Sequence, residues 1–179
     1  MSIYICGACE AGKSKVTEEI SDSFPDLELV LDPSIALFSA VFKGRSLGRI
    51  LRCEEWEGHL EESYGILINL IEIYEREDII TNEGPLMLLS HLMFFGILHS
   101  FNDQQRKEIL TRCYALLSTG THFIVQRWVD SGDFCEASTK LQIGFKFGRA
   151  NVSVIPKAEN YETTVAQAVE FIKDKMEVE

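Results

Sequence analysis

The sequence lacks the features of several large classes of protein. None of its apolar runs reaches the ~18 residues that a membrane-spanning helix needs, and its N-terminus has no signal-peptide profile. Basic residues are scarce: 17 Lys and Arg stand against 28 Asp and Glu, for a net charge of −11. General nucleic-acid binding needs clustered positive charge, so this balance argues against it. We expect a cytoplasmic chain with no membrane or nucleic-acid partner.

The cysteines do not form a disulfide framework. There are five, an odd number, and their spacing matches no such framework. Cys6 and Cys9 form a C-x-x-C, but Cys6 closes an apolar run and no second Cys/His pair follows nearby, which argues against structural zinc. This cysteine usage is typical of a reducing compartment.

One local motif stands out in what the sequence does contain. Residues 7–14 match the phosphate-loop pattern G-x-x-x-x-G-K-[ST] and lie between the apolar run 3–6 and a helical pattern. In such a loop, backbone N–H groups wrap around phosphate oxygens, and the following helix points its positive end at them. Lys13 would reach the β- and γ-phosphates, and the Ser14 hydroxyl would be a ligand of Mg²⁺. The motif therefore predicts an ATP and Mg²⁺ site, with ATP preferred over GTP by analogy, formed by Gly7, Ala8, Cys9, Glu10, Ala11, Gly12, Lys13, Ser14 and Lys15.

The rest of the chain alternates between strand-like and helix-like apolar patterns. Strand patterns cover 2–6, 27–31, 78–81, 122–126 and 152–155, and helical patterns cover 13–24, 56–74, 86–98, 103–117, 133–147 and 161–176. Strands separated by helices predict a parallel sheet with helices on both faces. We therefore predict one α/β domain over residues 1–179, a three-layer P-loop NTPase fold with a five-stranded parallel sheet.

Polar residues follow the predicted strands, where ligands of such sheets gather. Asp32 follows the second strand and can serve as a general base on an acceptor hydroxyl, or as a helix N-cap. Glu83 follows the third strand and can support Mg²⁺ through water, or favour the start of the next helix. Arg127 follows the fourth strand and can stabilise charge on a transferred phosphoryl group, or form a surface salt bridge.

A dense basic group lies between the second and third predicted strands. It consists of Lys43, Arg45, Arg49 and Arg52, the last three on one face if the segment is helical. Arg45 and Arg49 can grip a phosphate or carboxylate of the acceptor, with Asp32 and Glu83 as further acceptor contacts. Pairing with the nearby acidic residues 54, 55 and 57 is the alternative.

These features resemble the P-loop nucleoside and nucleotide kinases, and most of all the nicotinamide-riboside kinase part of NadR-type proteins. The resemblance rests on the phosphate loop, on Asp32, and on residues 79–86, which are similar to an apolar strand followed by Asp-Arg-Gly-Pro; residues 91–96 continue it in register. Here Asn82-Glu83 stands in place of Asp-Arg, so the metal-associated carboxylate is lost or displaced by one residue.

The resemblance implies ATP-dependent transfer of a γ-phosphoryl group to a small nucleoside, nucleotide or related hydroxyl acceptor. Asn82 supports a different reading, a nucleotide-binding regulatory module that has lost catalysis. An ATPase or GTPase acting on a macromolecular partner is a third. The sequence leaves open the identity of the acceptor and whether the chain forms a homodimer.

Overall fold

The computed structural model describes residues 1–42, 58–130, 132–146 and 151–177. Within these residues one parallel sheet contains β1 (Ile3–Gly7), β2 (Glu28–Val30), β3 (Ile79–Thr81), β4 (Thr121–Val125) and β5 (Val152–Val154). The strand order is β2-β3-β1-β4-β5, which makes the first strand central. The predicted five-stranded parallel sheet is confirmed.

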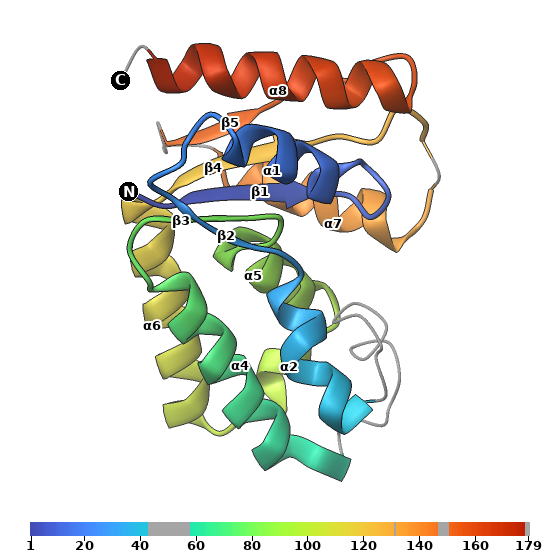
Figure 1. The fold of residues 1–179 in the computed structure, drawn as a ribbon. Helices are drawn as coiled ribbons and strands as arrows, with labels where there is room; N and C mark the ends of the chain where they lie inside the picture. Colours follow the sequence, from blue (N-terminus) through green and yellow to red (C-terminus); the bar gives the residue numbers. More distant parts are fainter. Residues whose placement is uncertain (43–57, 131, 147–150, 178–179) are drawn as a thin grey trace.

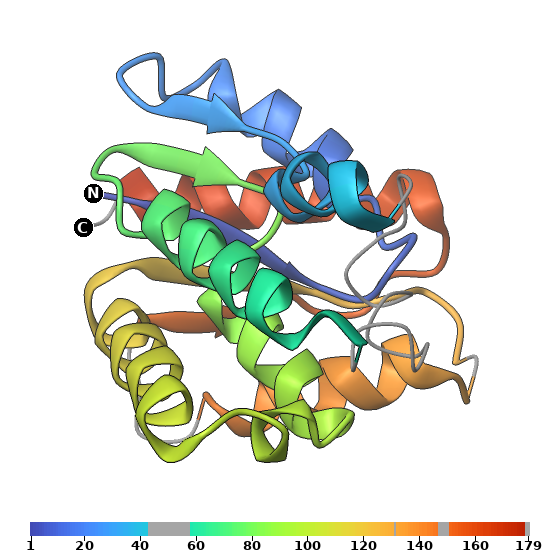
Figure 2. The ribbon, with the colours of Figure 1, turned by 90° about the horizontal axis from the view of Figure 1, so that it is seen from below.

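Helices cover both faces of the sheet and complete three layers (Figure 1). The helices are α1 (Lys13–Ser21), α2 (Pro33–Phe42), α4 (Leu60–Tyr74), α5 (Pro85–Phe94), α6 (Asp103–Thr119), α7 (Phe134–Gly144) and α8 (Tyr161–Glu177). Helices α1 and α8 pack together on one face, and Figure 2 shows α4, α5 and α6 across the other, with α2 and α7 toward one edge. Over the described ranges, no helix is both long and apolar enough to cross a membrane.

The central strand shows why both faces carry helices. Side chains alternate along a strand, and here both sets are apolar. Ile3 and Ile5 belong to the core under α1 and α8, whereas Tyr4 and Cys6 belong to the core under α4, α5 and α6. A strand buried on both faces cannot leave either one to solvent, so the sheet must lie between two helical layers.

Local signals set several helix ends. Asn102 and Gln105 form a reciprocal capping box at the start of α6, with bonds of 3.0 and 3.2 Å. Asp133 caps α7 by accepting the Glu136 N–H at 3.1 Å. The prediction of one helix over 86–98 is wrong at its end. Helix α5 stops at Phe94, where Gly96 adopts a φ of 67°, and a short 3-10 turn, η2 (Ile97–His99), follows.

Candidate functional site

The carboxyl end of β1 lies at the centre of one sheet edge, between the ends of β3 and β4 (Figure 1). The register pairs Gly7 with Val125, and the Ala8 N–H donates to the Val125 carbonyl at 3.4 Å. Parallel strands all end at the same edge, so the loop after β1 lies beside the residues that follow β3 and β4. This edge is the candidate site.

Two glycines of the loop have conformations and surroundings that side chains do not fit. Gly7 has a φ of 124°, and a Cβ there would lie 2.0 Å from the Val125 carbonyl oxygen. Gly12 has a φ of 82°, and a Cβ would meet the Val165 side chain at 2.8 Å. The first glycine lets the loop leave the sheet, and the second lets it turn into α1, whose N-terminus faces the loop.

Lys13 begins α1, and its side chain folds back over the loop. Its Nζ donates to the Ala8 carbonyl oxygen at 2.7 Å. Its positive charge also favours the ionised form of the buried Glu83 carboxyl. The ammonium is therefore held at the loop, where a phosphate oxygen would compete with the carbonyl for its protons.

Asn82 connects the ends of two strands to the start of α1. Its side chain is buried, at 1% exposure. The amide nitrogen donates to Ser14 Oγ and to Asp32 Oδ1, each at 2.7 Å, and the amide oxygen accepts the Asp32 N–H at 2.7 Å. Both donor hydrogens and the acceptor oxygen are thus used. A carboxylate in this position could not donate to Asp32, so the amide fits this arrangement where an aspartate would not.

Asp32 is held by Asn82 in an unusual backbone conformation. Its φ of 47° lies in the left-handed region, which is strained for a residue other than glycine. The Ala36 N–H donates to the Asp32 carbonyl at 3.2 Å, as at the residue before a helix. The structure therefore places Asp32 at the entry to α2, with one carboxylate oxygen bound to the Asn82 amide.

Glu83 is buried against the first turn of α2. Its two carboxylate oxygens accept the Ser34 N–H at 2.9 Å and the Ser34 hydroxyl at 2.5 Å. Burial raises the pKa of the Glu83 carboxyl, the two bonds from Ser34 and the charge of Lys13 oppose that rise, and Asp32 adds to it. The sequence left two roles open for Glu83, support of Mg²⁺ through water or the start of the following helix, α5. The structure instead shows it capping α2, 49 residues earlier.

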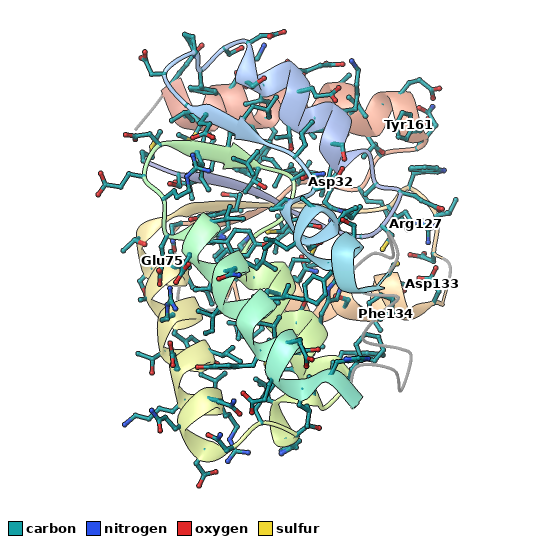
Figure 3. All side chains as sticks on the ribbon, turned by 60° about the horizontal axis from the view of Figure 1, so that its bottom comes forward. Asp32, Glu75, Arg127, Asp133, Phe134 and Tyr161 are labelled. Carbon is teal, nitrogen blue, oxygen red and sulfur yellow. The ribbon has the colours of Figure 1, made fainter. Side chains whose placement is uncertain are left out.

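Arg127 ties the phosphate loop to α7, as Figure 3 shows for Arg127 and Asp133. Its guanidinium pairs with the Glu10 carboxylate and, at 2.9 Å, with Asp133. The bond to Asp133 raises the pKa of Arg127, burial opposes that rise, and the bond to Glu10 adds to it. The side chain is 15% exposed, which makes this more than a pair of fully solvated charges. A cation therefore stands beside the loop, held by two acidic residues.

An aromatic pair beside the loop has no counterpart in the sequence reasoning. Trp128 and Tyr161 meet edge to face with ring centroids 5.6 Å apart, and the Tyr161 ring lies 3.2 Å from the position of a Cβ on Gly12. The sequence marks Asn82 only as a departure from the family's Asp, with no sign of the hydrogen bonds that its amide makes. Arg45 and Arg49, predicted to bind the acceptor, lie outside the described residues.

The side chains near the loop that could be metal ligands are few, which suits a metal ion held mainly by phosphate oxygens. Among the described residues, no group of three or more His, Cys, Asp and Glu side chains gathers in a way that could hold a metal ion. Mg²⁺ in phosphoryl-transfer sites keeps several waters and takes only one or two protein ligands. Ser14 Oγ can be such a ligand, and Asp32 Oδ1 accepts a hydrogen bond from the same Asn82 amide nitrogen as Ser14 Oγ.

Comparison with known proteins places the fold. No protein-family model matches this chain, and no curated protein sequence matches it. Among solved structures, the deoxyadenosine kinase of M. mycoides with bound dCTP is 14% identical over 100% of both chains, with a TM-score of 0.55. The shikimate kinase of Acinetobacter baumannii in complex with shikimate is 13% identical over 99% of this chain and 94% of its own, with a TM-score of 0.50. At these identities the likeness shows the fold alone, an α/β fold shared with these two kinases.

Proposed function

We propose that this chain is an ATP-dependent phosphotransferase that moves the γ-phosphoryl group of ATP to a small hydroxyl acceptor. The observation that carries the proposal is the hydrogen-bonded chain Ser14–Asn82–Asp32 beside the phosphate loop. It joins the residue expected at the metal to the residue expected at the acceptor hydroxyl. The P-loop kinase fold supports the same reaction.

Each residue has a chemical task in this proposal. Lys13 neutralises charge on the β- and γ-phosphates, and Ser14 is the Mg²⁺ ligand. Mg²⁺, when bound, would neutralise negative charge on these phosphates. Asp32 accepts the proton of the attacking hydroxyl through the carboxylate that Asn82 orients. Arg127 stabilises the transferred group by exchanging one of its carboxylate partners for a phosphoryl oxygen.

The acceptor is proposed to be a nucleoside, a nucleotide or a related compound such as nicotinamide riboside. Asp32 and Glu83 would contact it from the strand ends, and Arg45 and Arg49 would bind its phosphate or carboxylate. We further propose that residues 1–179 work as one cytoplasmic domain that needs no nucleic acid or membrane.

A second function is favoured by Asn82 itself. Its neutral amide directs a donor, and not a lone pair, toward Ser14. A site that had given up metal-dependent chemistry would tolerate such a group, because nucleotide binding needs the loop but not a carboxylate behind the metal. The alternative is therefore a nucleotide-binding regulatory module.

Labelled ATP separates the two functions. The full chain is incubated with γ-labelled ATP and a panel of nucleosides, nucleoside monophosphates, nicotinamide riboside and shikimate, with and without Mg²⁺, while ATP binding is measured by calorimetry. Mg²⁺-dependent transfer to any acceptor supports the kinase. ATP binding that is indifferent to Mg²⁺, with no transfer across the panel, overturns it in favour of the regulatory module.

A further inference from the structure

Two cysteines from distant parts of the sequence meet at the phosphate loop. Cys9 lies within the loop and is exposed, and Cys135 is the second residue of α7 and partly buried. The Cys135 thiol is hydrogen-bonded to Cys9, and the Cys9 backbone N–H donates to the Cys135 sulfur. Cys6 and Cys113, the other described cysteines, are buried in the core. The pair at the loop is thus open to reagents in solution.

Contacts of the residues around Cys9 and Cys135 hold the phosphate loop and α7 together. Arg127 binds Glu10, the residue after Cys9, and Asp133, the N-cap of the helix that carries Cys135. Cys135 also packs against the core cluster that includes Ala8 and Ala11. Figure 3 places Arg127 between the loop and the start of α7, next to Asp133 and Phe134. The first turn of α7 is therefore held against the phosphate loop by an ion pair and by apolar packing.

The two thiols differ in their environment. The hydrogen bond to Cys9, followed by burial, raises the pKa of the Cys135 thiol. Cys135 thus keeps its proton, whereas Cys9 is exposed and accepts a hydrogen bond at its sulfur. Because Cys9 is exposed and Cys135 is partly buried, a peroxide in solution reaches Cys9 first, so Cys9 is the residue that attacks the oxidant and Cys135 the one that resolves the product.

We propose that Cys9 and Cys135 form a reversible disulfide that shuts the phosphate loop to nucleotide. Cys9 and Cys135 are far apart along the chain, and the only cysteines close together in the sequence are Cys6 and Cys9. The regulatory part of the inference rests on the proposed nucleotide site. The disulfide itself does not depend on that site.

The oxidant is a peroxide, and the chemistry balances in two steps. The Cys9 sulfur attacks the O–O bond, which breaks to give a sulfenic acid on Cys9 and one water. The Cys135 sulfur then attacks the Cys9 sulfur, the S–O bond breaks, and the hydroxyl leaves as a second water with the Cys135 proton. The two sulfurs lose one electron each, and the peroxide gains two. A dithiol reductant reverses the change by thiol–disulfide exchange.

The disulfide would weaken nucleotide binding because it constrains the backbone N–H of Cys9. A phosphate loop binds by turning its N–H groups toward the anion, and the Cys9 N–H already points to the Cys135 sulfur. A covalent bond between the two residues keeps residue 9 turned to α7. If oxidation leaves the binding-competent loop in a tenth of the molecules or fewer, apparent affinity falls at least about tenfold.

Peptide mapping tests the bond directly. After treatment with hydrogen peroxide, trypsin should release residues 1–13 joined to residues 128–140, two hydrogen atoms lighter than the sum of the free peptides, and fragmentation should assign Cys9 over Cys6. The linkage should form in Cys53→Ser and be absent from Cys9→Ser and Cys135→Ser. No linkage in the wild type, or a linkage of Cys9 to any cysteine but Cys135, overturns the inference.

Binding of a fluorescent ATP analogue tests the consequence. The oxidised wild type should bind at least about tenfold more weakly than the reduced protein and recover with dithiothreitol, while Cys135→Ser should bind alike before and after peroxide. By reciprocity, a saturating concentration of the analogue should lower the equilibrium fraction of disulfide in the wild type in a fixed dithiothreitol redox buffer. A mapped disulfide with unchanged affinity overturns the regulation. If the reduced protein binds no nucleotide, the proposed function fails and the mapping alone decides the modification site.

Discussion

The side-chain amide of Asn82 donates to the Asp32 carboxylate at 2.7 Å and accepts the Asp32 backbone N–H at the same distance. These two hydrogen bonds, between residues 50 positions apart, fix both the backbone and the side chain of Asp32. It also leaves the second hydrogen of the amide for Ser14. The relationship makes Asn82 a positioning residue for the proposed base, and several predictions depend on it.

Replacing Asn82 by aspartate should destabilise the protein. Asn82→Asp removes the donor to Asp32 and brings two carboxylates together, so we expect a loss of about 1–3 kcal/mol in the free energy of unfolding. Urea denaturation at neutral pH measures it. The exchanged pair Asp32→Asn/Asn82→Asp restores one donor and one acceptor and should recover part of the loss. Equal stability of the single variant and the wild type would contradict the role given to the amide.

Asp32→Asn should lower turnover by roughly 10²-fold or more and leave ATP affinity nearly unchanged, because a base acts only on the acceptor's proton. Steady-state kinetics with calorimetric ATP binding distinguish the two effects. Asp26→Asn, on an exposed turn, is the matched control. If the Mg²⁺ requirement rises in Asp32→Asn while turnover at saturating Mg²⁺ is kept, Asp32 serves the metal and not the acceptor.

Glu83→Gln should change how stability depends on pH. Burial raises the pKa of Glu83 in the folded protein, so between the unfolded and the folded pKa values the folded state holds a proton that the unfolded state has lost. Stability contributed by this group is therefore complete below the unfolded pKa and declines as the pH rises through the folded pKa. Glu83→Gln should flatten that decline in thermal unfolding from pH 4 upward.

The exposed Glu170→Gln is the control for this pH profile, and its curve should follow the wild type. The same Glu83→Gln protein also tests the metal role. If Glu83 supports Mg²⁺, the concentration needed for half-maximal rate should rise. A flattened pH profile with an unchanged Mg²⁺ requirement would restrict Glu83 to capping α2.

Lys13→Ala should abolish nucleotide-dependent activity and leave the fold intact. The side chain lies over the loop and fills no core position, so its removal deletes electrostatic stabilisation without opening a cavity. Circular dichroism and labelled-ATP turnover check the two halves. Lys107→Ala, exposed on α6, controls for loss of a positive charge. Near-normal turnover in the folded Lys13→Ala protein would refute the phosphate-loop assignment.

Arg127→Ala should reduce turnover by about 10²-fold if the guanidinium stabilises the transferred phosphoryl group. A purely structural ion pair predicts unchanged turnover with a stability loss of about 1 kcal/mol or less. Turnover and urea unfolding of the same preparation decide between them. Arg112→Ala, whose guanidinium binds Glu75 away from the loop, is the matched control for the loss of an ion-paired arginine.

The sequence by itself determined the features that depend on neighbouring residues. The phosphate-loop motif and the apolar run of the first strand are set within a few positions along the chain, so motif and periodicity identify them. The alternation of strands and helices then predicted the parallel sheet. One local prediction missed, because the apolar run after Phe94 continues past the turn at Gly96.

Only the tertiary structure decided how the strand ends meet. Ser14 and Asn82 are 68 residues apart, and their contact depends on the placing of β3 beside β1, which no periodicity records. The same holds for Glu83, whose position after β3 suggested the next helix although its oxygens cap α2. Cys9 and Cys135 likewise meet because the first turn of α7 packs against the phosphate loop. Side-chain direction at the edge of a parallel sheet is set by strand order and by packing from other elements, so the sequence predicted which polar residues follow the strands and the fold decided their partners.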